Sequence, residues 1–257
     1  MKLFTPTLRR LVNIGLSRKA AAFVTAALLT STAVTSLRAH SGDGDSDDNE
    51  REGRSHRCAQ VVPPNAHPYG LSYGQWQARW WQWSISIPFA THPYVSADFA
   101  AVNQSGPVWF LVGTTDPTPR EITVPRGKAL FFPLANTECS NVETPPFFGV
   151  DEAAMRLCNR AFVRTDLECF VDGVPVCDLD RFERESPLFS FSAPDGNILT
   201  GGPAVSGQAV GSGAYIMVPP LAVGRHLLQF KATQTDPVLG SFTFYGIYHI
   251  TVPARHH

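Results

Sequence analysis

One short segment of the chain has apolar residues at the spacing of an α-helix. In "LSYGQWQARWWQWSISIP" (71–88) they are separated by four, three and four residues, close to the 3.6-residue period of one buried helix face. These residues are Trp76, Trp80, Trp83 and Ile87. Ser72 and Gln75 fit a capping box at the start of the segment, and Pro88 ends it. We therefore expect a helix whose three tryptophans on this face belong to the core.

A fourth tryptophan of this segment lies off the apolar face. Trp81 is rotated by roughly 100° from the stripe, because each residue of an α-helix advances by that angle. We interpret Trp81 as the ring of this helix that is most free to contact a ligand.

Most of the other apolar positions follow the patterns of β-strands, either alternating with polar residues or forming short apolar runs. These stretches are residues 106–113, 128–136, 187–192, 224–232 and 241–252. An Asp-Gly pair at 172–173 predicts a hairpin, and residues 151–162 predict a short second helix. The expected fold is all-β, an antiparallel β-sandwich or jelly roll with one tryptophan-rich helix and one short second helix.

The start of the chain has a different composition from the rest. Residues 1–39 combine a basic beginning with an uncharged apolar run and predict a signal peptide. Residues 40–57 are acidic and almost free of apolar side chains, which predicts a disordered linker. Residues 58–257 are then expected to form a single β-sandwich domain. This organisation predicts a secreted or periplasmic protein whose mature form has no membrane span.

Removal of the predicted signal peptide makes the chain acidic. Residues 1–39 hold six of the 21 Lys and Arg and none of the 22 Asp and Glu, which leaves a net charge of −7. A nucleic-acid partner requires a basic stripe, and the sequence has none. We expect a polysaccharide or another component of the cell envelope as partner, and the sequence leaves the oligomeric state open.

The chain has five cysteines, and an exported protein is expected to form disulfides. With a three-residue loop 172–174, Cys169 faces Cys177 across the hairpin and forms one disulfide. Cys139 and Cys158 form the second, and Cys58 is left over. The cysteine spacings do not resemble a zinc site, so we expect no metal and no cofactor.

Candidate site residues occur where polar groups interrupt apolar elements. Asn136 and Glu138 follow an apolar run, and a glycine-rich segment at 194–213 is a candidate covering loop. The residues expected to act in catalysis are Glu138, His249 and Tyr245, and those expected to bind a substrate are Trp81, His92, Asn136 and Asp98. If they line one concavity, burial should raise the pKa of Glu138, since burial disfavours the charged form.

Three stretches resemble an uncharacterised group of exported bacterial proteins. They are the blocks W-x3-WW-x-W in residues 76–83, GPVWFL in residues 106–111 and VP-x-GKALFFP in residues 124–133. The resemblance covers about residues 69–140 and implies a recurrent exported domain. No activity is known for that group, so the resemblance assigns no catalytic residue.

Three interpretations of function follow. The first is an exported β-sandwich domain that binds a glycan or another hydroxyl-rich polymer, an analogy at the level of the fold. The second is a polysaccharide-directed lyase or hydrolase in which Glu138 and His249 supply acid–base chemistry. The third is a structural protein of the cell envelope. A closed cleft with titratable groups favours the enzyme, whereas a flat aromatic strip favours the binding domain.

Overall fold

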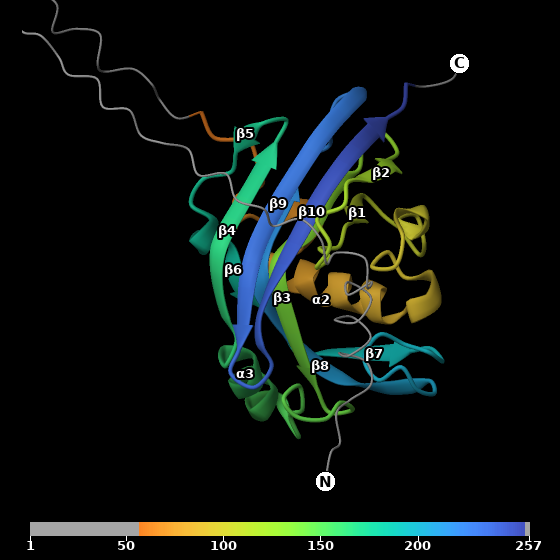
Figure 1. The fold of residues 1–257 in the computed structure, drawn as a ribbon, viewed down its shortest axis with the longest axis vertical. Helices are drawn as coiled ribbons and strands as arrows, with labels where there is room; N and C mark the ends of the chain where they lie inside the picture. Colours follow the sequence, from red (N-terminus) through yellow and green to blue (C-terminus); the bar gives the residue numbers. More distant parts are fainter. Residues whose placement is uncertain (1–56, 255–257) are drawn as a thin grey trace, which may run out of the picture.

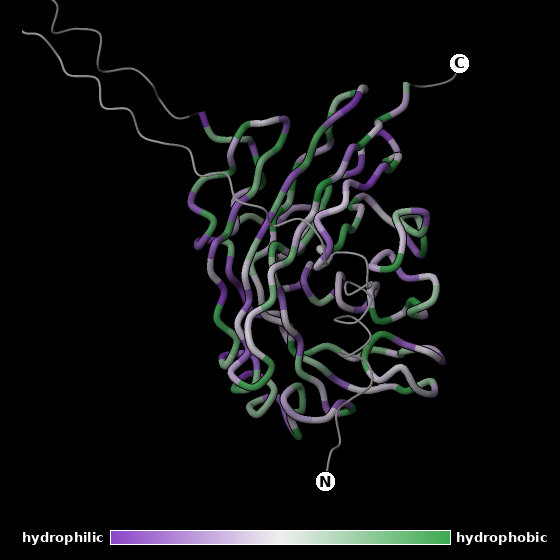
Figure 2. Tube along the Cα trace, viewed as in Figure 1, coloured by the Kyte–Doolittle hydropathy of each residue, from purple (hydrophilic) through white to green (hydrophobic). Residues whose placement is uncertain are grey.

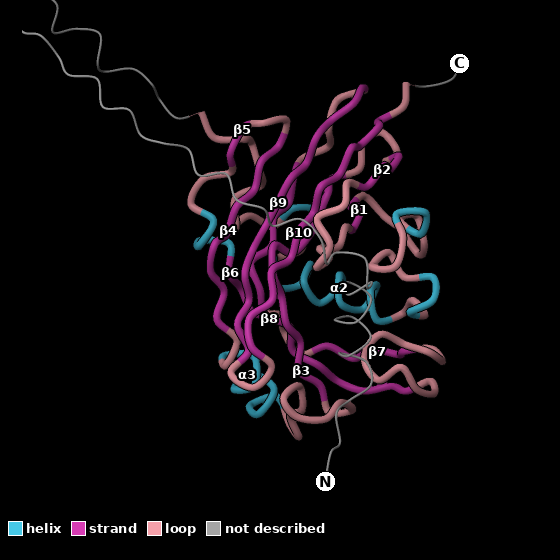
Figure 3. The backbone as a smooth tube through the Cα atoms, in the orientation of Figure 1, coloured by secondary structure: helices cyan, strands magenta, loops and turns pink. Residues whose placement is uncertain are grey.

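The structure is a computed structural model and describes residues 57–254 of the 257-residue chain. Strands dominate these residues, with two α-helices beside them (Figures 1 and 3). The predicted signal peptide (1–39) and all but the last residue of the predicted linker (40–57) lie outside the described residues. The described part of the chain is therefore β-rich, as predicted.

Two five-stranded sheets form the framework. The first sheet has the order β1-β3-β8-β6, with β7 also paired to β8, and the second has the order β2-β10-β9-β4-β5. The strands of the first sheet are β1 (Val108–Phe110), β3 (Ala129–Ser140), β6 (Glu183–Glu185), β7 (Phe189–Ala193) and β8 (Val205–Val218). Those of the second sheet are β2 (Arg120–Thr123), β4 (Val163–Val171), β5 (Val174–Pro175), β9 (Gly224–Asp236) and β10 (Gly240–Val252).

The expectation of purely antiparallel sheets is wrong. β1 pairs with β3 in parallel, and β2 pairs with β10 in parallel, so both sheets are mixed. These two strands have three and four residues and lie at the edges of their sheets. Apolar alternation shows which face of a strand is buried but not the direction of its neighbour. The sequence therefore predicted β1, β3 and β10 but not the direction in which β1 pairs with β3. It did not predict β2, and so it could not predict the β2–β10 pair.

The tryptophan-rich segment forms α2 (Tyr73–Ile85) as expected. Gln75 N–H donates to Ser72 Oγ at 3.3 Å and Ser72 N–H donates to Gln75 Oε1 at 2.9 Å, which completes the predicted capping box. All four tryptophans of α2 are buried. The Trp80 ring lies 5.9 Å from that of Tyr215 on β8, so α2 covers one face of the first sheet.

The other face of the first sheet packs against the second sheet. Phe132 on β3 stacks on Phe230 on β9 with 4.8 Å between the ring centroids. Hydrophobic and hydrophilic residues alternate along the strands of the second sheet, because only one face of it is covered (Figure 2). The core therefore has two layers, one on each side of β3 and β8.

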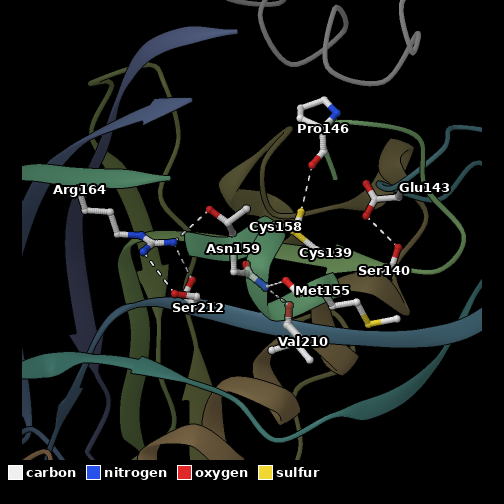
Figure 4. Close-up of a disulfide and its surroundings, with 11 residues drawn as sticks. Cys139, Ser140, Glu143, Pro146, Met155, Cys158, Asn159, Arg164, Val210 and Ser212 are labelled. Atoms are coloured by element: carbon white, nitrogen blue, oxygen red, sulfur yellow. Dashed lines mark hydrogen bonds between the residues drawn. A yellow bond between two sulfur atoms is a disulfide. The ribbon is translucent and has the colours of Figure 1, made fainter. Parts of the chain in front are cut away.

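The second predicted helix is α3 (Glu152–Arg160), and Asp151 Oδ1 caps it by accepting from Ala154 N–H at 2.8 Å. The predicted Cys139–Cys158 disulfide is confirmed and joins α3 to the end of β3 (Figure 4). The predicted Cys169–Cys177 disulfide is wrong. Cys177 pairs with Cys58, and Cys169 is a buried free thiol.

The hairpin turn explains this error. Asp172 and Gly173 both have positive φ angles and form a two-residue loop, so Val171 pairs with Val174. Cys169 then lies opposite Val176, whose N–H donates to its carbonyl oxygen at 2.8 Å. A shift of one residue moves a side chain to the other face of a strand. Cys177 instead meets the segment that begins at Cys58, where Ala59 N–H donates to Pro175 O at 2.8 Å.

The glycine-rich segment 194–213 is only partly a loop. From Val205 onward it belongs to β8, which pairs with β3 over most of its length. The preceding turn is organised by Asn197, whose Oδ1 accepts from Leu199 N–H at 3.1 Å and Thr200 N–H at 2.9 Å. The loop is therefore confined to residues 194–204, and residues 205–213 belong to a central strand.

Substitution of Trp80 tests the role of α2 in the core. Trp80 is 0% exposed and its Nε1 donates to Leu111 O at 2.8 Å. Trp80→Ala should lower the free energy of unfolding by roughly 3–5 kcal/mol, as large-to-small changes in cores do. Arg79→Ala, on the exposed face of the same helix, is the control and should change stability by no more than about 0.5 kcal/mol. Equal urea midpoints for the two variants would contradict this packing.

The disulfide pairing is tested by mapping peptides of the oxidised protein without reduction. Cys58 should be recovered joined to Cys177, and Cys139 joined to Cys158. Cys169 should react with an alkylating reagent only after unfolding, because its thiol is buried. The Cys58–Cys177 bond spans 119 residues and should contribute up to about 5 kcal/mol in the chain-entropy model. A peptide joining Cys169 to any other cysteine would contradict the structure.

Candidate functional site

A cavity of about 600 Å³ lies beside the second half of β3. Its walls come from β3, the connected ends of β9 and β10, the β1–β2 loop, and the segment after α2. Aromatic side chains make up much of the lining, namely Trp81, Phe89, Tyr94, Phe147, Phe162, Phe242 and Phe244. This volume is typical of sites that enclose a small organic molecule.

Glycines on β8 make room for the polar end of the cavity. Gly211 pairs with Glu138 and Gly213 pairs with Asn136. A Cβ at Gly211 would lie 2.6 Å from Trp81 Cδ1, and a Cβ at Gly213 would lie 2.8 Å from Asn136 Cβ. The ring of Trp81 can therefore pack directly on the β8 backbone beside Glu138, which larger residues on β8 would prevent.

Glu138 is buried at this end of the cavity. Its residue is 4% exposed, and its Oε2 has no hydrogen-bond partner among the described residues. Burial raises the pKa of Glu138 to about 7, and a hydrogen bond with Glu143 partly opposes the rise. The sequence prediction of a buried Glu138 with a raised pKa is thus confirmed.

Glu143 forms a carboxyl pair with Glu138. Ser140 Oγ donates to Glu143 Oε2 at 2.9 Å, which turns this carboxyl group inward (Figure 4). Burial and the neighbouring Glu138 charge both raise the pKa of Glu143 well above its ordinary value. Two carboxyl groups in such contact cannot both ionise easily, so the pair holds a shared proton.

The Cys139–Cys158 disulfide holds this pair in place. Cys139 directly follows Glu138, and Glu143 lies within the segment that the disulfide closes (Figure 4). The disulfide therefore joins β3, which carries Glu138, to α3. The loop between them carries Glu143.

A second buried acidic residue, Asp236, lies at the end of β9. Asp236 is 3% exposed, and its Oδ1 accepts from Val238 N–H at 2.5 Å and Leu239 N–H at 2.6 Å. Its Oδ2 has no partner among the residues that the structure describes. Asp236 also lines the cavity, so the cavity has unpaired acceptors on two different strands.

The charges that line the cavity are mostly negative. Four acidic residues line it, and Arg120 is the basic residue among its lining residues. The acidic residues are Asp116, Glu138, Glu143 and Asp236. The Arg120 guanidinium donates to Pro93 O and lies 5.9 Å from the centre of the Tyr248 ring, so contacts within the protein already occupy it.

Three predicted site residues meet at the cavity. Glu138, Asn136 and Trp81 all line it. Asn136 Nδ2 donates to the hydroxyl of the buried Tyr215 at 2.6 Å. Trp81 is less free than predicted, because it is only 7% exposed, and its Nε1 has no acceptor among the described residues. Residues 198–200 of the glycine-rich segment also line the cavity.

His92 has a structural position instead. It is buried, its ring lies 3.1 Å from Ser84 Oγ through Nε2, and its Nδ1 accepts from Tyr94 N–H at 3.1 Å. Burial lowers the pKa of His92 to about 3, so the ring is neutral. His92 stacks on Tyr94 with 4.3 Å between centroids and positions that cavity-lining ring, rather than lining the cavity itself.

Tyr245, His249 and Asp98 do not join the cavity. On β10, Phe242 and Phe244 face the cavity, so Tyr245 and His249 lie on the opposite face of the strand. His249 is exposed, with Nδ1 at 2.5 Å from Glu121 Oε1 on β2. Asp98 is exposed and accepts from Ser96 Oγ at 3.0 Å. The predicted single site of Glu138, Tyr245 and His249 is therefore wrong.

Sequence reasoning missed Glu143 and Asp236. One signal pointed to Glu143, since it lies in the loop that the predicted Cys139–Cys158 disulfide closes over the end of β3. Asp236 precedes Pro237 in a turn, where aspartate is ordinarily explained by capping alone. Capping does not explain the unpaired Oδ2 of Asp236, which becomes notable only because Asp236 lines the cavity.

A smaller cavity of about 350 Å³ lies between β4 and the end of α3. Its buried Arg164 donates to Ser212 O at 3.1 Å (Figure 4). The same guanidinium donates to Glu183 Oε1 at 2.6 Å and to Thr137 Oγ1 at 3.1 Å. Protein acceptors satisfy this guanidinium, whereas Oδ1 of Asn159, which also lines the cavity, has no partner among the described residues.

Two further properties concern residues 57–254. No cluster of three or more His, Cys, Asp or Glu side chains in this part of the chain is arranged to hold a metal ion. No helix of this part is long and apolar enough to cross a membrane.

Comparisons with known proteins do not assign the chain to a family. No protein-family model and no curated protein matches the chain. Among solved structures, the chain is similar to the crystal structure of the cysteine protease inhibitor EhICP2 from Entamoeba histolytica, at 10% sequence identity and a TM-score of 0.21. The match covers 56% of this chain and 95% of that chain. A similarity this low carries no argument about fold or function.

The pKa of Glu138 predicts a pH dependence of stability. The unfolded chain releases this proton near pH 4.5, whereas the folded protein holds it to about pH 7. The folded state binds more protons in this window, so the free energy of unfolding should fall as the pH rises through it. Glu138→Gln should make this fall smaller without abolishing it, because burial also raises the pKa of Glu143, and the variant should be more stable than the wild type at pH 8.

Urea unfolding of both proteins between pH 4 and pH 8 measures the difference. Asp98→Asn, which changes an exposed carboxylate outside the cavity, should keep the wild-type pH profile. A Glu138→Gln variant less stable than the wild type at pH 8 would show that the buried carboxyl group is a stabilising charge.

Proposed function

We propose that this protein acts outside the cytoplasm and binds a small hydroxyl-bearing organic molecule, such as the end of a glycan chain, in the 600 Å³ cavity. The observation that carries the proposal is that two buried carboxyl groups, Glu138 and Asp236, each with one unpaired oxygen, line a largely apolar cavity. A buried polar atom without a partner costs free energy that a ligand donor would recover.

The shape of the site favours a chain end or a single small molecule over the middle of a polymer. An extended polymer needs an open strip of exposed aromatic rings, whereas Trp81 is buried and the other lining rings converge around one space. The largely apolar walls also lower the local polarity, which strengthens hydrogen bonds to the carboxyl groups.

Secretion or transfer to the periplasm is part of the proposal. Two disulfides are typical of an oxidising compartment. The basic and apolar composition of residues 1–39 supports a signal peptide that directs the chain there.

A second candidate function is acid–base catalysis on a polysaccharide, as a lyase or hydrolase. The observation that favours it is the Glu138–Glu143 pair, in which burial raises the pKa of Glu138 to about 7. A group with a pKa near the working pH is suited to exchange protons with a substrate. In this version Glu143, rather than His249 or Tyr245, is the partner of Glu138. A structural role in the cell envelope is the third alternative.

Binding of glycans is tested by isothermal titration calorimetry of the oxidised protein with a panel of mono-, di- and trisaccharides. At least one should bind, and Phe242→Ala should weaken binding roughly tenfold, equivalent to about 1.4 kcal/mol, because Phe242 lines the cavity and is only partly buried. Phe148→Ala removes an exposed ring outside the cavity and should leave affinity unchanged.

Product analysis of the same mixtures separates the two main candidates. Release of shortened or unsaturated sugars that stops in Glu138→Gln supports the enzyme, and unchanged sugars support the binding domain. If no sugar binds or reacts, the glycan assignment is wrong.

A further inference from the structure

We infer that the cavity selects ligands that carry a protonated amine, which pairs with the carboxyl groups of Glu138 and Asp236 while apolar side chains surround the rest of the molecule. This inference rests on the proposed ligand-binding function and specifies the class of ligand. It stands on the composition of the lining and on two carboxyl oxygens without partners.

The balance of charge favours a cation. Four carboxyl groups line the cavity against one guanidinium, that of Arg120, so the lining stays net negative even with the proton that Glu138 and Glu143 share. A neutral alcohol offers one donor, whereas an ammonium group offers three and also supplies the missing positive charge. Burial of a charge is tolerated only when it is paired, and these carboxyl groups supply the pair.

The aromatic walls favour an organic cation over an inorganic one. Trp81, Tyr94, Phe242 and Phe244 all line the cavity. A ring face attracts an ammonium group within about 6 Å, and the same rings bury the hydrocarbon part of an amine. An inorganic cation would gain nothing from this apolar surface, and it would need several oxygen ligands around one point. The cavity therefore combines anionic groups with an apolar body, which is the complement of an amphipathic amine.

Amine binding should release a proton. The Glu138–Glu143 pair holds a shared proton in the free protein, and an ammonium group close to it favours the ionised carboxylate. The proton leaves to solvent, and the charge on Glu138 then pairs with the ammonium group. Other titratable and charged groups surround the pair. They are Tyr94 after α2, Asp116 in the β1–β2 loop, Arg120 on β2, Tyr215 on β8 and Asp236 on β9. Arg164 on β4 lies beyond Tyr215.

Two pairs of probes test the inference by calorimetry: 2-phenylethylamine with 2-phenylethanol, and cyclohexylmethylamine with cyclohexylmethanol. Within each pair the molecules differ only by an amine in place of a hydroxyl. At pH 8 each amine should bind at least tenfold more tightly than its alcohol. The affinity of the amines should fall at least tenfold between pH 8 and pH 5, and that of the alcohols should stay constant. Titrations at pH 6, where the free protein still holds the Glu138 proton, in buffers of different ionisation enthalpy should detect proton release with the amines alone.

Two variants locate the effect. Glu138→Gln should bring each amine within about threefold of its alcohol while alcohol binding persists, since the side chain keeps its size. Glu121→Gln removes an exposed carboxylate outside the cavity and should leave the amine preference intact, which controls for net charge.

The outcomes separate this inference from the proposed function. Alcohols that bind as tightly as amines, or sugars that bind when no amine does, overturn the amine inference and leave the cavity as a ligand site. If neither probe pair nor any sugar binds, the cavity is no ligand site and both proposals fail. An amine preference that survives Glu138→Gln also overturns the inference as stated.

Discussion

The packing of α2 against β3 and β8 is the constraint on which the rest of the structure depends. Four tryptophan rings on one short helix need more space than an ordinary sheet face offers. The chain supplies it with small residues on β8, and Gly211 is so close to Trp81 that a Cβ there would lie 2.6 Å from the ring. Because Gly211 pairs with Glu138, the same small residue that accommodates the helix also leaves Glu138 without a bulky cross-strand neighbour.

The polar end of the cavity follows from this arrangement. β3 is buried along nearly its whole length, so a carboxylate near its end has no access to bulk water. A buried charge without a partner is expensive, and the protein reduces the cost by holding a proton between Glu138 and Glu143. The disulfide at Cys139 prevents the simplest relief, in which the end of β3 moves outward and exposes its carboxyl group. The framework itself therefore keeps the Glu138 carboxyl group buried.

The sequence predicted the local features of this fold well, and the features that depend on register or on distant contacts poorly. The period of Trp76, Trp80 and Trp83 was sufficient for α2, because helix periodicity and capping are local. The Cys169–Cys177 pairing failed because one residue in the length of a turn decides which cysteine faces which. The role of the glycines in β8 was also missed, since glycine in a sequence signals a loop as readily as it signals close packing.

The candidate site shows the same division. Glu138, Asn136 and Trp81 were predicted to share a concavity, and all three line the cavity. Asn136 and Glu138 are two residues apart on β3, so their side chains lie on the same face. Trp81 packs on Gly211 of β8, which pairs with Glu138. Tyr245 and His249 were grouped with them because both stand on the more polar face of β10. That face points away from the cavity, which is lined by the apolar face carrying Phe242 and Phe244. The expectation that site residues gather on a polar face therefore failed on this strand.

Two buried carboxyl groups at the cavity break the local agreement between sequence and structure, and this is the physical reason to look for function there. Along β3 apolar residues are buried as a central strand requires, until Asn136, Thr137 and Glu138 interrupt the pattern. A sequence selected for stability alone would place an apolar residue there, because replacing buried polar groups by apolar ones is often neutral or stabilising. Asp236 repeats the conflict on the neighbouring sheet, with one oxygen satisfied by the turn and the other unpaired. Natural proteins break such rules mainly at functional sites. Two independent violations that line one cavity are best explained by a ligand that completes both.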